Sequence, residues 1–413
     1  MAGRVKLAVL GGSSVASPEL IRALTERTDR PSIEVVLLGR TGHKLERVAA
    51  LSARLAARAS VPLTVTHTTD LRRGLEGANY VLNQIRVGGY PARAYDESFP
   101  HAFGLPGEET FGPGGLSNAR RTIPVALEYC RAIEQVAPEA LLINLTNPSS
   151  FIQYAVAKYT RVNVVGVCDS PIGLARGIAA LLGAPLDELW VGYVGMHHFG
   201  WVTEVRWRGR DVMPEVLVRV ENLPGLPVDA DLVRAMRAVP TAYFKYYYHS
   251  DRMLAKQRGQ KTRAEQLLEL EARLMADYEA EGLDRLPESL AARGAHWYAE
   301  IVVPVLIAHV NDSRAIFTLN VANGAAIGWL PPEAIVELPV VVTRHGFPPL
   351  QPPSAPPDIQ AMVRTNAAFE MLWVEAVVEQ SYAKALRAMR LNHLVHDLDQ
   401  ARAILKEIWA PHA

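Results

Sequence analysis

The sequence predicts an α/β fold in which a Rossmann-like, doubly wound parallel sheet is followed by a mixed α+β part. Three observations predict it. Short apolar runs alternate with helix-like stretches through the first half, the first run ends in a glycine turn, and the second half mixes strand-like with helix-like patterns. The pattern changes after residue 168, so we expect one domain over residues 1–168 and a second over residues 169–413.

The first half carries five apolar runs with the length of buried strands. Helix-like stretches, such as residues 44–57 and 122–136, separate them, and this alternation is typical of a parallel sheet covered by helices. The runs lie at residues 6–10, 33–38, 79–85, 140–145 and 162–167.

The second half has no single repeating pattern. Residues 190–207 alternate like strands, whereas residues 263–278 and 361–386 have helical character. Residues 348–357 are rich in proline and are expected to form a loop. These patterns predict a mixed α+β domain.

The composition is that of an ordinary globular protein. Of 413 residues, 43 are basic and 43 acidic, and no basic stripe favours a nucleic-acid or membrane partner, so a small-molecule ligand is expected. The start of the chain lacks the pattern of a secretory signal, and no stretch is apolar enough to span a bilayer. Two cysteines, Cys130 and Cys168, cannot build a disulfide framework, and we expect a cytoplasmic protein.

The turn after the first apolar run is a candidate dinucleotide site. Gly11, Gly12, Ser13 and Ser14 precede a helix-like stretch, and glycines there let backbone N–H groups approach a pyrophosphate. The pair is less than a full G-x-G-x-x-G motif, and an ordinary tight turn is the alternative.

The end of the second run lacks the acidic residue that usually holds the ribose of NAD. Gly39 and Arg40 stand there instead, and Arg40 is suited to stack on adenine or to meet a 2′-phosphate. NAD and NADP are therefore both candidates, and a solvated loop arginine is the alternative. Asn83, at the end of the third run, is a further candidate contact of the cofactor.

Several short motifs follow in a fixed order, and together they carry a resemblance. The motifs lie at residues 83–89, 112–115, 145–148, 168–171, 195–201, 243–248, 262–265, 293–295 and 320–324. In this order they resemble glycoside hydrolase family 4, the NAD- and metal-dependent glycosidases, over nearly the whole chain. Within the family the chain looks most like the 6-phospho-β-glucosidase branch.

The resemblance implies an unusual hydrolysis of a phosphorylated glycoside, outside the usual two-carboxylate mechanism. In the family, NAD oxidises carbon 3 of the sugar, and a divalent metal, here expected to be manganese, polarises the resulting ketone. A base then removes the proton on carbon 2, the aglycone leaves, water adds, and carbon 3 is reduced again. The family also implies a homodimer or homotetramer.

The resemblance assigns the metal to Cys168 and His198. A thiolate and an imidazole suit one divalent ion, whose other positions substrate and water would fill. Without the resemblance, Cys168 would be read as a small core residue and His198 as a histidine satisfied within a strand. His197 stands where the family usually has asparagine, so it either adds a ligand or alters sugar recognition.

The resemblance also implies a catalytic base and an acid. The family's base is a tyrosine, which Tyr243 matches best, although Tyr246 lies one helical turn further on. Asp169, beside the metal cysteine, is placed to protonate the leaving oxygen, a role for a carboxyl group with a raised pKa. An Asx turn before Pro171 is the alternative for Asp169.

Three residues are candidates for binding substrate. Asn147 matches the family's substrate-binding asparagine, with a turn residue before Pro148 as the alternative. Arg86 and Arg293 could meet a phosphate in bidentate fashion, or could form structural ion pairs.

Some positions depart from the family and leave the substrate open. Family glucosidases usually have glutamine in the segment 108–110, serine at Ala299, and in the β branch asparagine at Asp169. An aspartate there is typical of 6-phospho-α-glucosidases, which are the first alternative.

Two other kinds of protein are further alternatives. A 2-hydroxy-acid dehydrogenase would need a His–Asp pair and a carboxylate-binding arginine, and a non-catalytic nucleotide sensor would not keep Cys168 and His198.

Overall fold

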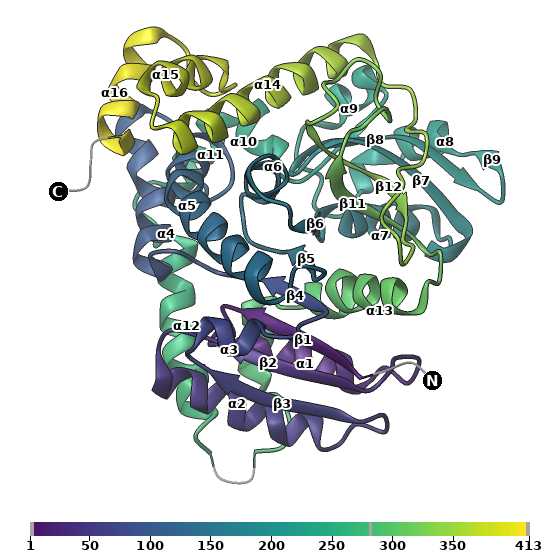
Figure 1. The fold of residues 1–413 in the computed structure, drawn as a ribbon. Coiled ribbons are helices and arrows are strands. Elements are labelled where there is room, and N and C mark those ends of the chain that lie inside the picture. Colours follow the sequence, from purple (N-terminus) through teal and green to yellow (C-terminus); the bar gives the residue numbers. More distant parts are fainter. Residues whose placement is uncertain (1–3, 281–282, 410–413) are drawn as a thin grey trace.

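The apolar runs of the first half form adjacent parallel strands, as the sequence predicts. The computed structural model describes residues 4–280 and 283–409, and its sheet has the strand order β3-β2-β1-β4-β5-β6 over this half (Figure 1). This is the order of a dinucleotide-binding Rossmann fold. The strands are β1 (Val5–Leu10), β2 (Ile33–Leu38), β3 (Leu63–Thr68), β4 (Tyr80–Asn83), β5 (Leu141–Asn144) and β6 (Asn163–Gly166).

The second half continues the same sheet with antiparallel strands. Beyond β6 the order is β11-β12-β7-β8-β10, and β9 pairs with β8. The expected Rossmann-like part followed by a mixed part is confirmed, but one continuous sheet crosses the expected boundary at residue 168. These strands are β7 (Leu189–Met196), β8 (Phe199–Trp207), β9 (Arg210–Asp211), β10 (Val239–Pro240), β11 (Ile316–Ala322) and β12 (Ile335–Val341).

Helices cover both faces of the sheet, because alternate strand residues point to opposite sides. In β1, Leu7 and Val9 join one apolar core with α1, α2 and α13, whereas Ala8 and Leu10 join a second core with α5, α6 and α14. The first helices are α1 (Ser17–Thr25), α2 (Gly42–Ala56), α3 (Leu71–Leu75), α4 (Gly89–Ser98), α5 (Gly112–Val136), α6 (Ser149–Tyr159), α7 (Ser170–Leu182), α8 (Met213–Val218) and α9 (Ala230–Met236).

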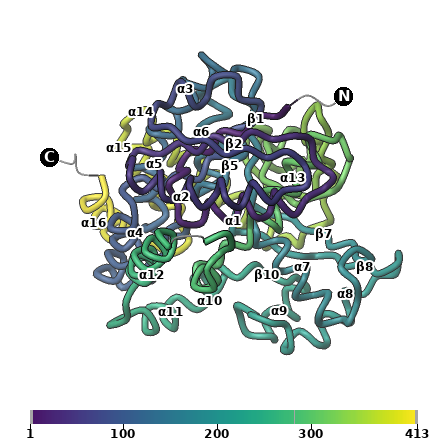
Figure 2. The backbone as a smooth tube through the Cα atoms, turned by 90° about the horizontal axis from the view of Figure 1, so that it is seen from below, coloured from purple at the N-terminus to yellow at the C-terminus, as the bar shows by residue number. Residues whose placement is uncertain are grey.

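The C-terminal helices pack back onto the N-terminal half. In Figure 1, α14 lies over α5 and α6, and in Figure 2 α12 lies beside α4. The remaining helices are α10 (Phe244–Tyr248), α11 (Ser250–Gln257), α12 (Arg263–Asp277), α13 (Val303–Asn311), α14 (Pro357–Glu379), α15 (Tyr382–Leu391) and α16 (Leu398–Trp409). Short turns of other helix types are η1 (Phe99–Phe103), η2 (Leu186–Glu188), η3 (Val220–Asn222), η4 (Glu288–Arg293) and η5 (Tyr298–Val302).

One expected helix differs from the structure. Residues 361–386 are not one helix, because α14 ends before Gln380, which has a φ of +53°, and Ser381 then caps α15. The proline-rich stretch is a loop up to Pro356, as expected. Among residues 4–280 and 283–409, no helix combines the length and the apolar character needed to cross a membrane.

The register aligns the strand ends that carry the motifs. Leu10 of β1 pairs with Asn83 of β4, Asn83 with Asn144 of β5, and Asn144 with Gly166 of β6. The chain segments that follow these four residues therefore leave the sheet at one carboxyl edge, which is where doubly wound sheets bind ligands.

We predict that Gly12→Ala lowers the free energy of unfolding by about 1–3 kcal/mol, because the added methyl overpacks a filled turn. A Cβ at Gly12 would lie 2.7 Å from Leu38 N and 2.8 Å from Leu37 Cα. Urea unfolding without cofactor measures the effect. The control is Gly42→Ala in the first turn of α2, where nothing lies within 4 Å and stability should hold or rise. Equal stability of the two variants would contradict the prediction.

Candidate active site

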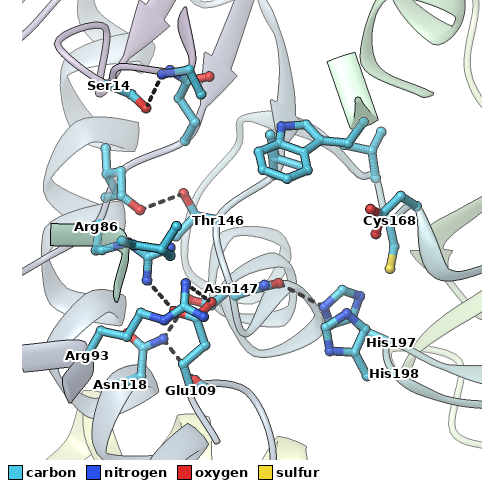
Figure 3. A pocket seen from close by; sticks show the side chains of 18 of the residues that line it. Ser14, Arg86, Arg93, Glu109, Asn118, Thr146, Asn147, Cys168, His197 and His198 are labelled. Carbon is cyan, nitrogen blue, oxygen red and sulfur yellow. Dashed lines mark hydrogen bonds and ion pairs between the residues drawn. The ribbon is translucent and has the colours of Figure 1, made fainter. Parts of the chain in front are cut away.

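A cavity of about 310 Å³ opens at the carboxyl edge, where β1, β4, β5 and β6 end. Its wall brings together residues from segments far apart in the sequence (Figure 3). They are Ser14, Ala16, Gln84, Ile85, Arg86, Arg93, Glu109, Asn118, Leu145, Thr146, Asn147, Val167, Cys168, Asp169, His197, His198, Tyr243, Arg263, Leu267, Arg293, Trp297 and Tyr298. Most of the predicted site residues are among them.

The glycine turn enters this cavity through Ser14. Gly12 N donates to Leu38 O at 2.7 Å, and Gly11 has a φ of +81°. Ser14 Oγ accepts a hydrogen bond from Ala16 N at 3.2 Å, one residue before α1 begins. The turn thus leads directly to a helix N-terminus, which is the arrangement that binds a pyrophosphate.

Among the expected cofactor contacts only Ser14 lines the cavity, whereas the wall does not include Gly11, Gly12, Ser13, Arg40 or Asn83. Arg40 is exposed and follows β2 beside the glycine turn, where a Cβ on Gly39 would lie 3.1 Å from Ser13 Cβ. Asn83 is buried at the end of β4, and its Nδ2 donates to Asn144 Oδ1 at 2.8 Å. Their cofactor contacts stay predictions, and the placement of Asn83 shows that it joins two strand ends.

Gln84 and Tyr298 form a contact that the sequence did not predict. Tyr298 OH donates to Gln84 Oε1 at 2.6 Å, and Gln84 Nε2 donates to Ser17 Oγ at 3.0 Å. Gln84 thereby fixes the wall between the glycine turn and η5. Gln84 lies inside the motif at residues 83–89, but its contact with Tyr298 is visible only in the folded structure.

One end of the cavity carries a buried group of metal-binding side chains. Cys168, His197 and His198 each offer one ligand atom, and these atoms lie within 4.8 Å of one another. Cys168 follows β6, whereas the two histidines form the turn of the hairpin between β7 and β8, with His198 at a φ of +59°. All three are buried, with exposed fractions of 4 to 6%. The expected pair Cys168 and His198 is thus brought together, and His197 joins it.

The surroundings suit these groups to bind a cation. Burial, and then His197, lowers the pKa of His198 well below its usual range, so the imidazole stays neutral. Thr110 Oγ1 donates to Glu108 and lies 3.0 Å from His198 Nδ1, so it accepts the proton of Nδ1 and leaves the lone pair on Nε2. Burial also raises the pKa of the Cys168 thiol, and a bound cation favours its deprotonation.

Tyr243 lies against this group and Tyr246 does not. The Tyr243 ring stacks on His198 with 3.6 Å between centroids, and it lines the cavity just before α10. Tyr246 instead packs near Phe111, with 6.3 Å between ring centroids. Burial, and then Glu108, raises the pKa of Tyr243 well above its ordinary value.

Asp169 begins α7 beside Cys168 and also lines the cavity. Its carboxylate makes no capping hydrogen bond to the helix, and Oδ2 lies 3.8 Å from His296 Nε2. Burial raises the pKa of Asp169, although His296 opposes this change. The structure therefore offers no capping bond in support of an Asx turn, and it keeps the carboxyl group available to the cavity.

The opposite end of the cavity is rich in arginine. Arg86 pairs with Glu109, and Arg93 Nη1 lies 2.9 Å from the other oxygen of Glu109. Burial raises the pKa of Glu109, but Arg86 and Arg93 outweigh burial and lower it to about 2. Burial and the charge of Glu109 raise the pKa of the adjacent Glu108 to about 7. Arg86 is thus engaged in the ion pair that was its alternative role.

Arg293 differs from Arg86, which pairs with Glu109, because none of the ion pairs among the described residues includes Arg293. Its guanidinium lies over the Trp297 ring at 5.0 Å from the centroid, and its buried Nε has no hydrogen-bond partner there. Arg263, from the start of α12, joins the same wall and donates to Ala292 O at 2.9 Å. An unpaired buried guanidinium is a ready site for an anion.

Asn147 lies between the two ends. His197 Nε2 donates to Asn147 Oδ1 at 2.9 Å, and Asn118 Nδ2 donates to Asn147 O at 3.2 Å (Figure 3). Asn147 thus connects the metal-binding group to the arginine-rich end, beyond being a turn residue before Pro148.

Sequence reasoning missed several residues of the wall: Arg93, Glu109, Asn118, Arg263, Trp297 and Tyr298. Arg263 lies inside the motif at residues 262–265 and Glu109 inside the segment 108–110, so a signal was available for both. The others are single residues within helices and loops, and their roles depend on neighbours that are distant in sequence.

The strand order and the buried Cys–His–His group define a Rossmann-fold enzyme equipped for a divalent cation. Comparison with known families makes this specific. Residues 6–184 match the Family 4 glycosyl hydrolase and residues 193–395 match the Family 4 glycosyl hydrolase C-terminal domain. The chain belongs to this family and is a glycosidase, which removes the dehydrogenase and sensor alternatives.

Relatives of both anomeric types are similar along nearly their whole length. A probable 6-phospho-β-glucosidase of Bacillus subtilis is 32% identical over 99% of this chain and 96% of its own, and a maltose-6′-phosphate glucosidase of the same organism is 27% identical over 97% and 94%. The structure of a 6-phospho-β-glucosidase from Thermotoga maritima with manganese, NAD⁺ and glucose-6-phosphate is 28% identical, covers 98% of this chain and 97% of its own, and superposes with a TM-score of 0.90.

We predict that Cys168→Ser and His198→Asn each abolish tight binding of Mn²⁺ while the fold is retained, since each removes one of few ligands. Asparagine tolerates the positive φ at position 198. Equilibrium dialysis measures binding, and circular dichroism checks folding. The control is Cys130→Ser, a buried cysteine of α5 outside the cavity, which should bind Mn²⁺ like the wild type. Unchanged binding in Cys168→Ser would contradict the assignment.

Proposed function

We propose that this glycosidase hydrolyses 6-phospho-β-glucosides with NAD and a divalent metal, for which manganese is the expected ion. The observation that carries the proposal is a single cavity that joins the glycine turn, the buried Cys–His–His group and an arginine-rich wall. The similarity of the whole chain to 6-phospho-β-glucosidases of the family supports a 6-phospho-β-glucoside as the substrate.

The cofactors would lie at the two places that suit them. Gly11, Gly12, Ser13 and Ser14 would hold the pyrophosphate of NAD, and Cys168 and His198 would bind the metal. When bound, NAD takes up and returns the hydride of carbon 3, and the cation polarises the ketone formed there. Because the hydride is returned, the reaction consumes no net NAD.

The residues beside the metal group supply the proton transfers. Tyr243 is the base that removes the proton from carbon 2, since its ring lies against His198 and its side chain lines the cavity. Asp169 is the acid that protonates the leaving oxygen, since burial raises its pKa and its carboxyl group faces the cavity. Asn147 would bind a sugar hydroxyl between the two ends.

The arginine-rich end would bind the phosphate of the substrate. Arg293 is the first candidate, because its guanidinium has no carboxylate partner in the described part of the chain. Arg86 would contribute less, because its charge is largely balanced by the ion pair with Glu109. Phosphate binding needs such charge-assisted, bidentate contacts.

A 6-phospho-α-glucosidase is the second candidate, and Asp169 is the observation that favours it. The aspartate after the metal cysteine is typical of the α branch, and elimination through a planar carbon 1–carbon 2 bond lets one site process either anomer. We place β above α on the basis of overall similarity. A phosphorylated sugar and NAD are cytoplasmic metabolites, so we also propose a cytoplasmic location. The family resemblance supports a homodimer or homotetramer.

We predict that Tyr243→Phe lowers kcat by about 10²–10⁴, the usual contribution of a general base, with little change in KM or in Mn²⁺ affinity. The phenyl ring keeps the stacking on His198, so only the hydroxyl is lost. Steady-state kinetics measure the effect. Tyr246→Phe is the matched control and should keep activity within about twofold. A loss confined to Tyr246→Phe would assign the base to that residue instead.

We predict that the wild type prefers nitrophenyl 6-phospho-β-glucoside in kcat/KM to the α-linked and to the unphosphorylated glucoside. Arg293→Gln should raise KM for the phosphorylated substrate about 10–100-fold, the effect of losing a charged hydrogen bond, and leave kcat/KM for the unphosphorylated glucoside unchanged. A clear preference for the α anomer would support the second candidate. Equal use of unphosphorylated sugar would refute the phosphate assignment.

A further inference from the structure

A buried glutamate lies behind the metal-binding group. Glu337, on β12, has an exposed fraction of 0%, and its carboxylate accepts hydrogen bonds from Tyr193 OH at 2.7 Å and Asn320 Nδ2 at 3.1 Å. Both donors are neutral. Within residues 4–280 and 283–409, its one contact with an ionisable nitrogen is with His197 Nδ1, at 3.8 Å from Oε1. A carboxylate buried without a cation is costly, so this arrangement needs a source of positive charge.

The hydrogen bond between His197 and Asn147 shows which nitrogen of His197 is available. Asn147 Oδ1 can only accept, so His197 Nε2 carries the proton, and the neutral ring then has its lone pair on Nδ1. His197 Nδ1 is buried and has no hydrogen-bond partner among the described residues. At 3.8 Å from Glu337 Oε1 it makes no hydrogen bond to that oxygen. His197 Nδ1 and Glu337 Oε1 thus face each other without a hydrogen bond between them.

A divalent cation resolves both problems. The ligand atoms of Cys168, His197 and His198 converge within 4.8 Å, beside Glu337. We propose that His197 Nδ1 is a third protein ligand of the catalytic metal, and that Glu337 is the buried carboxylate that balances and stabilises the charge of that metal. This rests on the proposed metal-dependent function. One thiolate and one carboxylate then neutralise the two charges of the ion.

The sheet register keeps Glu337 in this position. Gly166 pairs with Asn320, Asn320 with Glu337, and Glu337 with Gly195. Cys168 lies two residues after Gly166, and His197 lies two residues after Gly195. The carboxylate is therefore set between the strands that deliver the thiol and the imidazole, and Tyr193 and Asn320 hold its two oxygens.

A buried carboxylate beside a metal site favours the cation through its negative charge. Glu337 acts in this way, since its carboxylate lies outside the set of converging ligand atoms and makes no hydrogen bond to His197. Asn147 is the residue that orients the imidazole, by accepting from Nε2. We expect Glu337→Gln and His197→Asn each to weaken Mn²⁺ binding about 10–100-fold.

The test measures the dissociation constant of Mn²⁺ for the full chain, without substrate, by competition with a chromophoric chelator. Glu370→Gln is the matched control. Glu370 is also a buried carboxyl group, on α14, and accepts from Asn366 Nδ2 at 2.8 Å. Burial raises the pKa of Glu370 to about 8, so at pH 7 it is mostly uncharged and its replacement should change Mn²⁺ affinity less than about twofold.

A spectroscopic measurement separates metal ligation from a general loss of structure. With Co²⁺ in place of Mn²⁺, His197→Asn should shift the ligand-field absorption while the thiolate-to-metal band of Cys168 remains. Glu337→Gln should keep the thiolate band and titrate to saturation at higher Co²⁺ concentration. A variant with only a packing defect would lower the apo-protein Tm and leave the Co²⁺ spectrum and the Mn²⁺ affinity unchanged.

The outcomes distinguish this proposal from the proposed function. If Cys168→Ser loses Mn²⁺ while Glu337→Gln and His197→Asn bind it as tightly as the wild type, the third ligand and its carboxylate are refuted and the metal-dependent function stands. If the wild type itself shows no saturable Mn²⁺ binding, both proposals fail. If Glu337→Gln does not fold, His197→Asn alone decides, and wild-type affinity in that variant overturns the proposal.

Discussion

One row of paired residues across the sheet positions the active site. From β1 to β7, the residues Leu10, Asn83, Asn144, Gly166, Asn320, Glu337 and Gly195 lie in register. The packing around this row is tightest at Gly166. A Cβ there would lie 2.4 Å from Gln153 Oε1 and 2.8 Å from Asn320 Cβ. Only a glycine lets β11 approach β6, and this approach joins the parallel half of the sheet to the half that carries the histidines.

The cavity built on this row has two ends of different chemistry. Buried and neutral nitrogen and sulfur donors gather at one end, where burial lowers the pKa of His198 and raises that of Cys168. Guanidinium groups gather at the other end, where they hold Glu109 ionised. A phosphorylated sugar placed between them would have its phosphate near the arginines and its reacting carbons near the metal. The same separation keeps an anionic phosphate away from the thiolate.

The sequence was most informative where each strand is buried on both faces. Parallel strands such as β2 and β5 are nearly continuous apolar runs, so they were found from the sequence. The antiparallel strand β12 is almost entirely buried but went unnoticed, because Glu337 and Pro339 interrupt its apolar run. β3 and β11 also went unnoticed, and many of their residues are exposed or half-buried. In the site, Cys168 and His198 were located through the ordered motifs and the family resemblance that these motifs carry, whereas the two residues alone would be read as structural.

Other site residues could not be found from the sequence, because their roles depend on distant neighbours. Glu337 is a single acid in an apolar strand, and nothing local distinguishes it from a surface residue until β7 and β11 flank it. The choice between Tyr243 and Tyr246 required the start of α10, which turns only the first toward His198. Arg86 and Arg293 look alike in sequence, and only Glu109 separates a paired guanidinium from an unpaired one.

The central claim is that hydrolysis proceeds through removal of the proton on carbon 2, and not through direct displacement at carbon 1 by a pair of carboxylates. The most direct test is hydrolysis of the 6-phosphoglucoside in deuterated water with NAD and Mn²⁺, followed by mass spectrometry and NMR of the sugar product. The account predicts deuterium at carbon 2 of the released glucose-6-phosphate. Efficient hydrolysis with protium fully retained at carbon 2 would contradict it.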